Sequence, residues 1–139
     1  MYETVVATKR LLERALELAG VSAVVHNIRA IKPRMPHVII APQPSGVGRD
    51  SVNNQYLDTF QIQCVSGDPD SAMKILDALV DVFIDLEPND FPIRGATLVN
   101  CEVMDDRNTT DETTDGEDIF VGSFTIRLTV EKPRAQRRQ

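Results

Sequence analysis

The stretch that decides the fold is PDSAMKILDALVDVFIDL, residues 69–86. Its charged side chains avoid one stripe of the helical projection, which is the pattern of an amphipathic helix with one buried face. Asp68 supplies an N-cap, Pro69 suits the first helical position, and Pro88 closes the segment. The sequence therefore predicts a helix over residues 69–86. Its apolar stripe comprises Ala72, Ile75, Leu76, Leu79, Val82, Phe83 and Leu86.

Three segments around this helix alternate between apolar and polar residues, as half-buried strands do. They cover residues 55–65, 96–104 and 119–130. In the second segment Val99, Cys101 and Val103 are expected on one face, whereas in the first Leu57 is out of phase. We expect the helix stripe to pack on the apolar face that the strands over residues 55–65 and 119–130 form together. That face comprises Phe60, Ile62, Phe124, Ile126 and Leu128.

The N-terminal part adds a second helix and two short strands. Residues 3–19 have helical periodicity, and Gly20 is a natural stop because glycine enters the left-handed conformation cheaply. The expected buried arc of that helix is Val5, Leu11, Leu12, Ala15, Leu16, Leu18 and Ala19. Short strands are expected over 24–28 and 37–41, followed by a proline- and glycine-containing loop over 42–51. The fold class is α+β, with an antiparallel or mixed sheet and both helices on one face.

Length and composition limit the functions open to the chain. Its 139 residues predict one domain, residues 1–132, followed by a basic disordered tail over 133–139. The net charge of -6 argues against a general nucleic-acid binder. No apolar run approaches the roughly 20 residues of a bilayer-spanning helix, so no membrane association is expected. Cys64 and Cys101 are expected to be reduced, buried thiols of a protein made in the cytoplasm.

Charge is concentrated between Asp105 and Asp118. Seven of these fourteen positions are acidic, and Arg107 is the single base. A segment so polar and so long predicts an exposed acidic loop between the last two strands, which makes a long hairpin loop.

No motif in the chain supplies a catalytic, cofactor or metal site. Gly46-Val47-Gly48 leads toward a strand rather than a helix and lacks the lysine of a phosphate loop. A calcium-loop register starting at Asp111 fails at its third and twelfth positions, Thr113 and Gly122. His26 and His37 have no companion ligands at metal spacing. We therefore expect neither cofactor nor metal, and a protein that is not an enzyme.

The order and spacing of the elements resemble those of the tail terminator, or tail completion, proteins of long-tailed bacteriophages. The matching features run over about residues 3–132. They are the N-terminal helix, the segment PHVIIAP, a glycine-containing loop, the strand DTFQIQCVSGD, the helix PDSAMKILDALVDVF and the last strand FVGSFTIRLTVE.

The resemblance implies a small α+β subunit that assembles into a hexameric ring. Such a ring caps the tail tube, meets the head connector and lets DNA pass without specific binding. It implies a location at the head-proximal end of the virion tail, after synthesis in the bacterial cytoplasm. The alternatives are another head–tail connector or minor tail subunit, or a small protein-binding module; a hydrolase or transferase ranks last.

The charged segments are the candidate contacts with partners or with the ring lumen. The acidic stretch would meet either a basic neighbour or the DNA channel, and the basic tail either a nucleic acid or an acidic neighbour. The candidate residues are Asp105, Asp106, Arg107, Asp111, Glu112, Asp115, Glu117, Asp118, Arg49, Arg134, Arg137 and Arg138.

Overall fold

The chain forms one five-stranded sheet with helices beneath it. The structure, a computed structural model, describes residues 2–27, 35–43, 55–84, 86–114 and 117–133; for 105–114 and 117–118 it describes the backbone alone. The elements, in chain order, are α1 (Tyr2–Leu18), β1 (Val24–Asn27), β2 (His37–Gln43), β3 (Gln55–Ser66), α2 (Pro69–Phe83), a short 3-10 helix η1 (Pro88–Asp90), β4 (Thr97–Thr114) and β5 (Glu117–Glu131).

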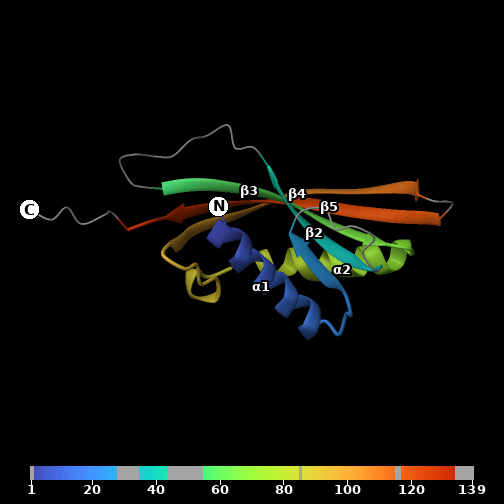
Figure 1. The fold of residues 1–139 in the computed structure, drawn as a ribbon, viewed down its shortest axis with the longest axis horizontal. Helices are drawn as coiled ribbons and strands as arrows, with labels where there is room; N and C mark the ends of the chain where they lie inside the picture. The colour runs from blue at the N-terminus through green and yellow to red at the C-terminus, as the bar shows by residue number, and fades with distance from the viewer. Residues whose placement is uncertain (1, 28–34, 44–54, 85, 115–116, 134–139) are drawn as a thin grey trace, which may run out of the picture.

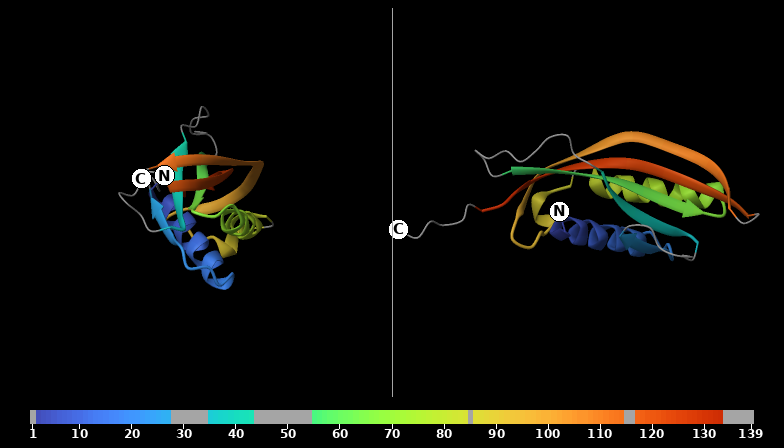
Figure 2. Two further views of the ribbon diagram at one scale, coloured as in Figure 1. Left: turned by 90° about the vertical axis from the view of Figure 1, so that its right-hand side faces the viewer. Right: turned by 45° about the horizontal axis from the view of Figure 1, so that its top comes forward.

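The sheet is open and mixed, in the order β1-β2-β3-β5-β4. β1 runs parallel to β2, and the three remaining pairs are antiparallel. Figure 1 and Figure 2 show α1 and α2 on the same face of this sheet. The predicted α+β class, with both helices on one face, is confirmed, and of the two sheet types left open the sheet is mixed.

The start of α2 is held as its sequence predicts. The Asp68 carboxylate accepts hydrogen bonds from the Asp70 amide at 3.3 Å and from the Ser71 hydroxyl at 3.0 Å, while Pro69 takes the first position. These acceptors satisfy donors that have no partner inside the helix. The regular helix ends at Phe83, three residues before the predicted end.

The core lies between α2 and the inner face of β3 and β5. Ile75, Leu79 and Phe83 are at most 2% exposed, as predicted, whereas Val82 is only partly buried. The rings of Phe83 and Phe124 are 6.1 Å apart and tilted, an arrangement typical of packed aromatic pairs. All five predicted sheet partners are buried as well: Phe60, Ile62, Phe124, Ile126 and Leu128.

α1 buries a slightly different stripe from the predicted one. Thr4 and Thr8 are buried, and the Thr8 hydroxyl donates to the Thr4 carbonyl at 2.8 Å. The inclusion of Leu18 and Ala19 is wrong, because both are exposed, Leu18 at 80%. Gly20, at φ 72°, ends the helix as predicted, with its amide bonded to the Glu17 carbonyl.

Most of the acidic stretch, residues 108–114 and 117–118, is paired strand, so the prediction of a long loop over residues 105–118 is wrong. β4 and β5 remain in register out to Thr114 and Glu117, with Asp115 and Gly116 between them. We call the part of this hairpin from residue 105 to residue 118 the acidic arm. Asp-Gly is a sequence typical of two-residue hairpin turns, and the arm is rich in β-branched threonine.

The register also explains how so acidic a ladder forms. No acid of the arm pairs directly with another acid in the described ladder: Asp111 faces Phe120, Glu112 faces Ile119 and Asp118 faces Thr113. Like charges directly opposite each other would destabilise the pair. The negative charge is therefore spread along the arm without placing two acidic residues directly opposite each other in the described ladder.

Two irregularities in β4 displace residues from the predicted pattern. Between Leu98 and Asn100 one residue, Val99, is extra, and it is 44% exposed instead of sharing a face with Cys101 and Val103. Between Met104 and Asn108 β4 advances four positions while β5 advances two, which leaves two extra residues at the base of the arm. Such bulges bend a strand and interrupt its free edge.

Truncation of Leu79 tests the helix–sheet core. Leu79 is fully buried, so Leu79→Ala should lower the free energy of unfolding by roughly 2–5 kcal/mol, through lost burial and the cavity left behind. The measurement is urea unfolding followed by circular dichroism. Met73→Ala is the control on the same helix, since Met73 is 40% exposed and should change stability by less than about 1 kcal/mol. Equal effects of the two substitutions would contradict the described packing.

Candidate functional site

The structure places part of the predicted contact set on the acidic arm. Asp105, Asp106 and Arg107 lie at the irregularity at its base, and Asp111 and Glu112 lie further out on β4. Glu117 and Asp118 begin β5. The other predicted contacts lie outside the described residues. They are Arg49, Asp115, Arg134, Arg137 and Arg138.

The arm does not have the geometry of a calcium loop. Residues 111–114 and 117–122 form an extended antiparallel ladder, whereas a calcium loop curls around its ion. The described residues contain no group of three or more His, Cys, Asp or Glu side chains placed to hold a metal. The rings of His26 and His37 lie edge to face, with centroids 6.0 Å apart.

The outer face of the sheet is largely polar at its centre, with Ile39, Ala41, Leu57 and Met104 as apolar members. The helices cover only the opposite face (Figure 2). In its central row the register aligns Gln43, Thr59, Arg127 and Glu102 across four strands. We call this the outer sheet face. Its central residues are Gln43, Thr59, Gln61, Gln63, Thr125, Arg127, Thr129, Asn100 and Glu102.

Arg127 lies at the centre of the outer sheet face with an unused donor. Its guanidinium approaches the Glu102 carboxylate at 3.9 Å, and its Nε atom is buried without a hydrogen-bond partner in the described structure. Gln63 donates to Gln61 at 2.9 Å, so amide groups on this face also bond to each other. A surface that mixes amides, hydroxyls and apolar side chains with one incompletely bonded arginine suits contact with another protein better than it suits chemistry.

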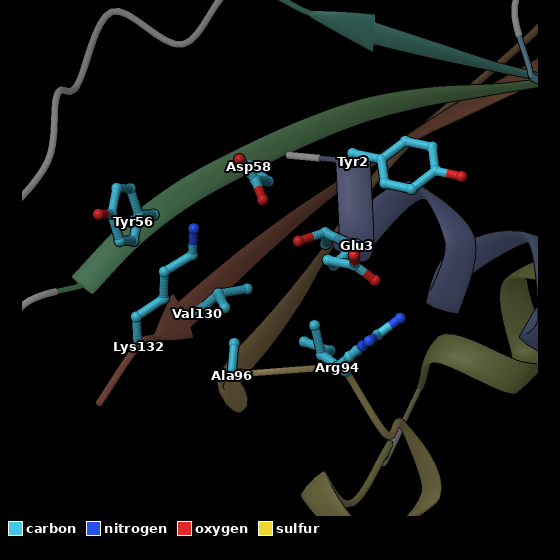
Figure 3. A pocket seen from close by; sticks show the side chains of 10 residues that line it. Tyr2, Glu3, Tyr56, Asp58, Arg94, Ala96, Val130 and Lys132 are labelled. Carbon is cyan, nitrogen blue, oxygen red and sulfur yellow. The ribbon is translucent and has the colours of Figure 1, made fainter. Parts of the chain in front are cut away.

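A pocket lies at the opposite end of β5 from the acidic arm. It is a cavity of about 190 Å³ between the first turn of α1, the end of β5 and the segment after η1. Four charged side chains line it: Glu3, Asp58, Arg94 and Lys132 (Figure 3). None of these four residues is among the contact residues predicted from the sequence.

Asp58 is the member of this pocket that the sequence signalled. It lies on the inner face of β3, in phase with Phe60 and Ile62, and is only 6% exposed. The apolar residue before it, Leu57, takes the outer face instead. The alternation of apolar and polar residues is therefore reversed at these two positions. Leu57 lies on the outer face of the sheet, and the carboxylate of Asp58 lies on the inner face.

The two cysteines lack the reactivity that a nucleophile needs. Burial raises the pKa of the Cys64 thiol to about 12 and that of the Cys101 thiol to about 11. Thiolate is the reactive form, so both thiols are inert near neutral pH. Both are free, as predicted; Cys64 is buried and Cys101 half-buried.

None of the helices that the structure describes is both long enough and apolar enough to cross a bilayer.

Comparisons with known proteins define the fold and leave the family open. No family model matches the chain, and no curated protein matches it. A solved chain titled "Virion of native gene transfer agent (GTA) particle" superposes with a TM-score of 0.63 at 14% identity, over 94% of this chain and 99% of that chain. At this identity the likeness shows a shared fold over nearly the whole of both chains. A second solved chain, at 17% identity, superposes with a TM-score of 0.46, which is too low to establish a shared fold.

Substitution of Asp58 tests whether its carboxylate supports the fold. Asp58→Asn keeps the shape and removes a buried charge, so it should raise the free energy of unfolding by about 1 kcal/mol. Asp81→Asn, on the exposed side of α2, is the matched control and should change stability by less than about 0.5 kcal/mol. The readout is thermal and urea unfolding. A loss of stability in Asp58→Asn would show that the carboxylate makes a structural contact.

Proposed function

We propose that this chain is a structural protein of a phage-like virion, and not an enzyme. The observation that carries the proposal is the whole-length likeness of its fold to a chain from a gene transfer agent virion. The two cysteines fit this proposal, because burial leaves both thiols unreactive near neutral pH. A protein whose work is assembly needs complementary surfaces rather than a reactive site.

Within that class, the role we propose is that of a tail terminator. In this role, copies form a ring, most simply of six, that caps the tail tube at its head-proximal end. The partners are then the tube protein on one side and the head–tail connector on the other, and DNA passes through the channel. The proposal rests on the order of elements in the sequence, which resembles that of this family, together with the likeness to the virion chain.

The structure offers two surfaces for such an assembly. The outer sheet face is broad and polar and remains uncovered by the helices. The acidic arm lies at one end of the sheet (Figure 1), and its tip, residues 112–114 and 117–118, extends beyond the part of β5 that pairs with β3. A closed ring needs two different surfaces that fit each other on successive copies, and the outer sheet face and the tip of the acidic arm are the two candidates.

The acidic arm has two roles open to it in a ring. It contacts a basic surface of a neighbouring subunit, or it lines the channel, where negative charge repels phosphates. We favour the contact with a neighbour. The arm is a paired ladder that reaches out from the body, and a preformed ladder loses little conformational entropy on binding.

Electron microscopy distinguishes the terminator from its alternatives. Purified protein is mixed with tail tubes that lack their head-proximal cap and imaged in negative stain. One closed ring at one end of each tube is the expected result. Rings stacked along the tube would identify a tube protein, and binding to isolated connectors alone would identify a connector subunit. No binding to any tail or connector component would contradict the virion proposal.

Two variants of the acidic arm distinguish the effect of its length from the effect of its charge. In the short variant, Asn-Gly replaces residues 113–118, so that Glu112 and Ile119 become the last pair of the hairpin. In the neutral variant, Asp111, Glu112, Asp115, Glu117 and Asp118 become the corresponding amides at full length. Both should fold with stability within about 1 kcal/mol of the parent, because neither removes a core residue.

The yield of infectious or transducing particles in complementation is the readout for these variants. If the arm binds a basic neighbour, both variants should lower the yield at least about tenfold. A neutral variant that assembles normally but delivers DNA slowly would favour the channel role. Normal assembly and delivery by both variants would show that the arm is only a connector between β4 and β5.

A further inference from the structure

The acidic arm holds a charge imbalance that the rest of the chain does not share. Of the 21 acids and 15 bases in the sequence, seven acids and one base fall between residues 105 and 118, so the remaining 14 acids and 14 bases balance. The whole net charge of -6 therefore belongs to the arm. A surface of this chain that binds the arm must gather cations locally, because the body as a whole offers no excess of positive charge.

Two arginines from separate elements meet at a groove beside the start of α1. The groove is a cavity of about 210 Å³ between α1 and the segment after η1, and it adjoins the pocket that Asp58 lines. Arg10 comes from α1 and Arg94 from that segment, and both are exposed. Among the lining residues Glu3 is the one acid, so the groove has a formal charge of +1. Figure 3 shows Arg94 and Glu3 at the end of the groove that the two cavities share.

Both guanidinium groups of the groove have donors to spare. Within the part of the chain that the structure describes, neither Arg10 nor Arg94 forms a hydrogen bond or an ion pair, and Glu3 bridges neither of them. A guanidinium has five donors in a planar fork that fits a carboxylate. Two such groups at one groove therefore suit a ligand that brings two carboxylates.

The tip of the acidic arm offers two carboxylates in such an arrangement. Glu112 pairs with Ile119 and Thr114 pairs with Glu117, so the register places Glu112 and Glu117 on one face of the ladder as diagonal neighbours. Residues in that relation are roughly 7–8 Å apart. The tip lies beyond the pairing of β5 with β3, so another copy reaches it without displacing a strand.

The carboxylates that enter a groove come from another copy of the chain. The groove lies near the C-terminal end of β5, whereas the arm of the same chain lies at the N-terminal end of that strand (Figure 1). The outer sheet face is a weaker counterpart, because its central arginine, Arg127, already has the Glu102 carboxylate at 3.9 Å.

We propose that the tip of the acidic arm of one copy docks in the groove of the next, with Glu112 and Glu117 bonded to Arg10 and Arg94. The inference names the basic neighbour of the arm and rests on that part of the proposed function. Arm and groove are different surfaces, so each copy gives one contact and receives one. Such a heterologous contact closes into a ring when the rotation between copies allows it.

A mixture of two neutralised variants isolates this contact in solution. The arm variant carries Glu112→Gln and Glu117→Gln, and the groove variant carries Arg10→Gln and Arg94→Gln. The one contact left in the mixture joins the arm of the groove variant to the groove of the arm variant. When the ¹⁵N-labelled arm variant is titrated with the unlabelled groove variant at low ionic strength, the amides of Ala7, Arg10 and Arg94 should shift. Added salt should reverse these shifts.

Matched variants show whether the contact depends on these charges. A titrant neutralised at both arm and groove should bind at least about tenfold more weakly than the groove variant. Glu3→Gln in the labelled chain should strengthen binding about twofold or more, because Glu3 repels the incoming carboxylates. The spectra report whether each variant is folded.

Exchanging the charges gives a second, independent readout. A labelled chain with Arg10→Glu and Arg94→Glu should not bind a titrant with the natural arm. It should bind a titrant with Glu112→Lys and Glu117→Lys, and the shifts should again lie at the groove.

Three results would overturn the proposal. They are the absence of groove shifts up to about 1 mM titrant, equal binding by the titrant without arm charges, and shifts centred on Thr125 and Arg127, which would make the outer sheet face the counterpart of the arm. The terminator role is decided separately, by the ring at the end of the tail tube, so the two proposals fail independently.

Discussion

The burial of α2 against the β3–β5 ladder is the interaction on which the rest of the fold depends. One stripe of the helix and one face of two long strands exclude water from each other, and the pair of rings Phe83 and Phe124 lies at this contact. Gly122 permits the close approach, because a Cβ at that position would come within 3.3 Å of the Leu76 side chain. β2, β1 and α1 then extend the layer on one side, and β4 extends it on the other.

Much of this arrangement could be predicted from periodicity alone. The stripe of α2 and the alternation in β3 and β5 report which face is buried, so the contact between them follows from the sequence. The acidic arm could not be predicted in the same way, because charge suggests a loop whereas the cross-strand register decides whether a ladder is tolerated. Here Asp111 faces Phe120 and Asp118 faces Thr113, and that pairing depends on bulges that no local pattern marks.

The candidate sites, like the fold, could be predicted from the sequence only in part. The arm was identified from its charge, but the predicted backbone conformation was wrong. The pair Asp115-Gly116 is a sequence signal for a hairpin and favours paired strands on either side of it. The pocket at Asp58 was missed, although the reversal of Leu57 and Asp58 in an alternating strand was visible. Its other members, Glu3, Arg94 and Lys132, come from three distant segments, and only the folded chain brings them to one cavity.

β5 gives the molecule a mechanical property that follows from its register. The strand begins in the acidic arm, forms twelve consecutive residue pairs with β3 along the core, and ends beside the pocket. Hydrogen bonds in an antiparallel ladder lie perpendicular to the strands. A tension applied to the arm along β5 would therefore load these bonds in shear, all together, instead of opening them one after another. A subunit built in this way resists pulling along its long axis far better than peeling across it.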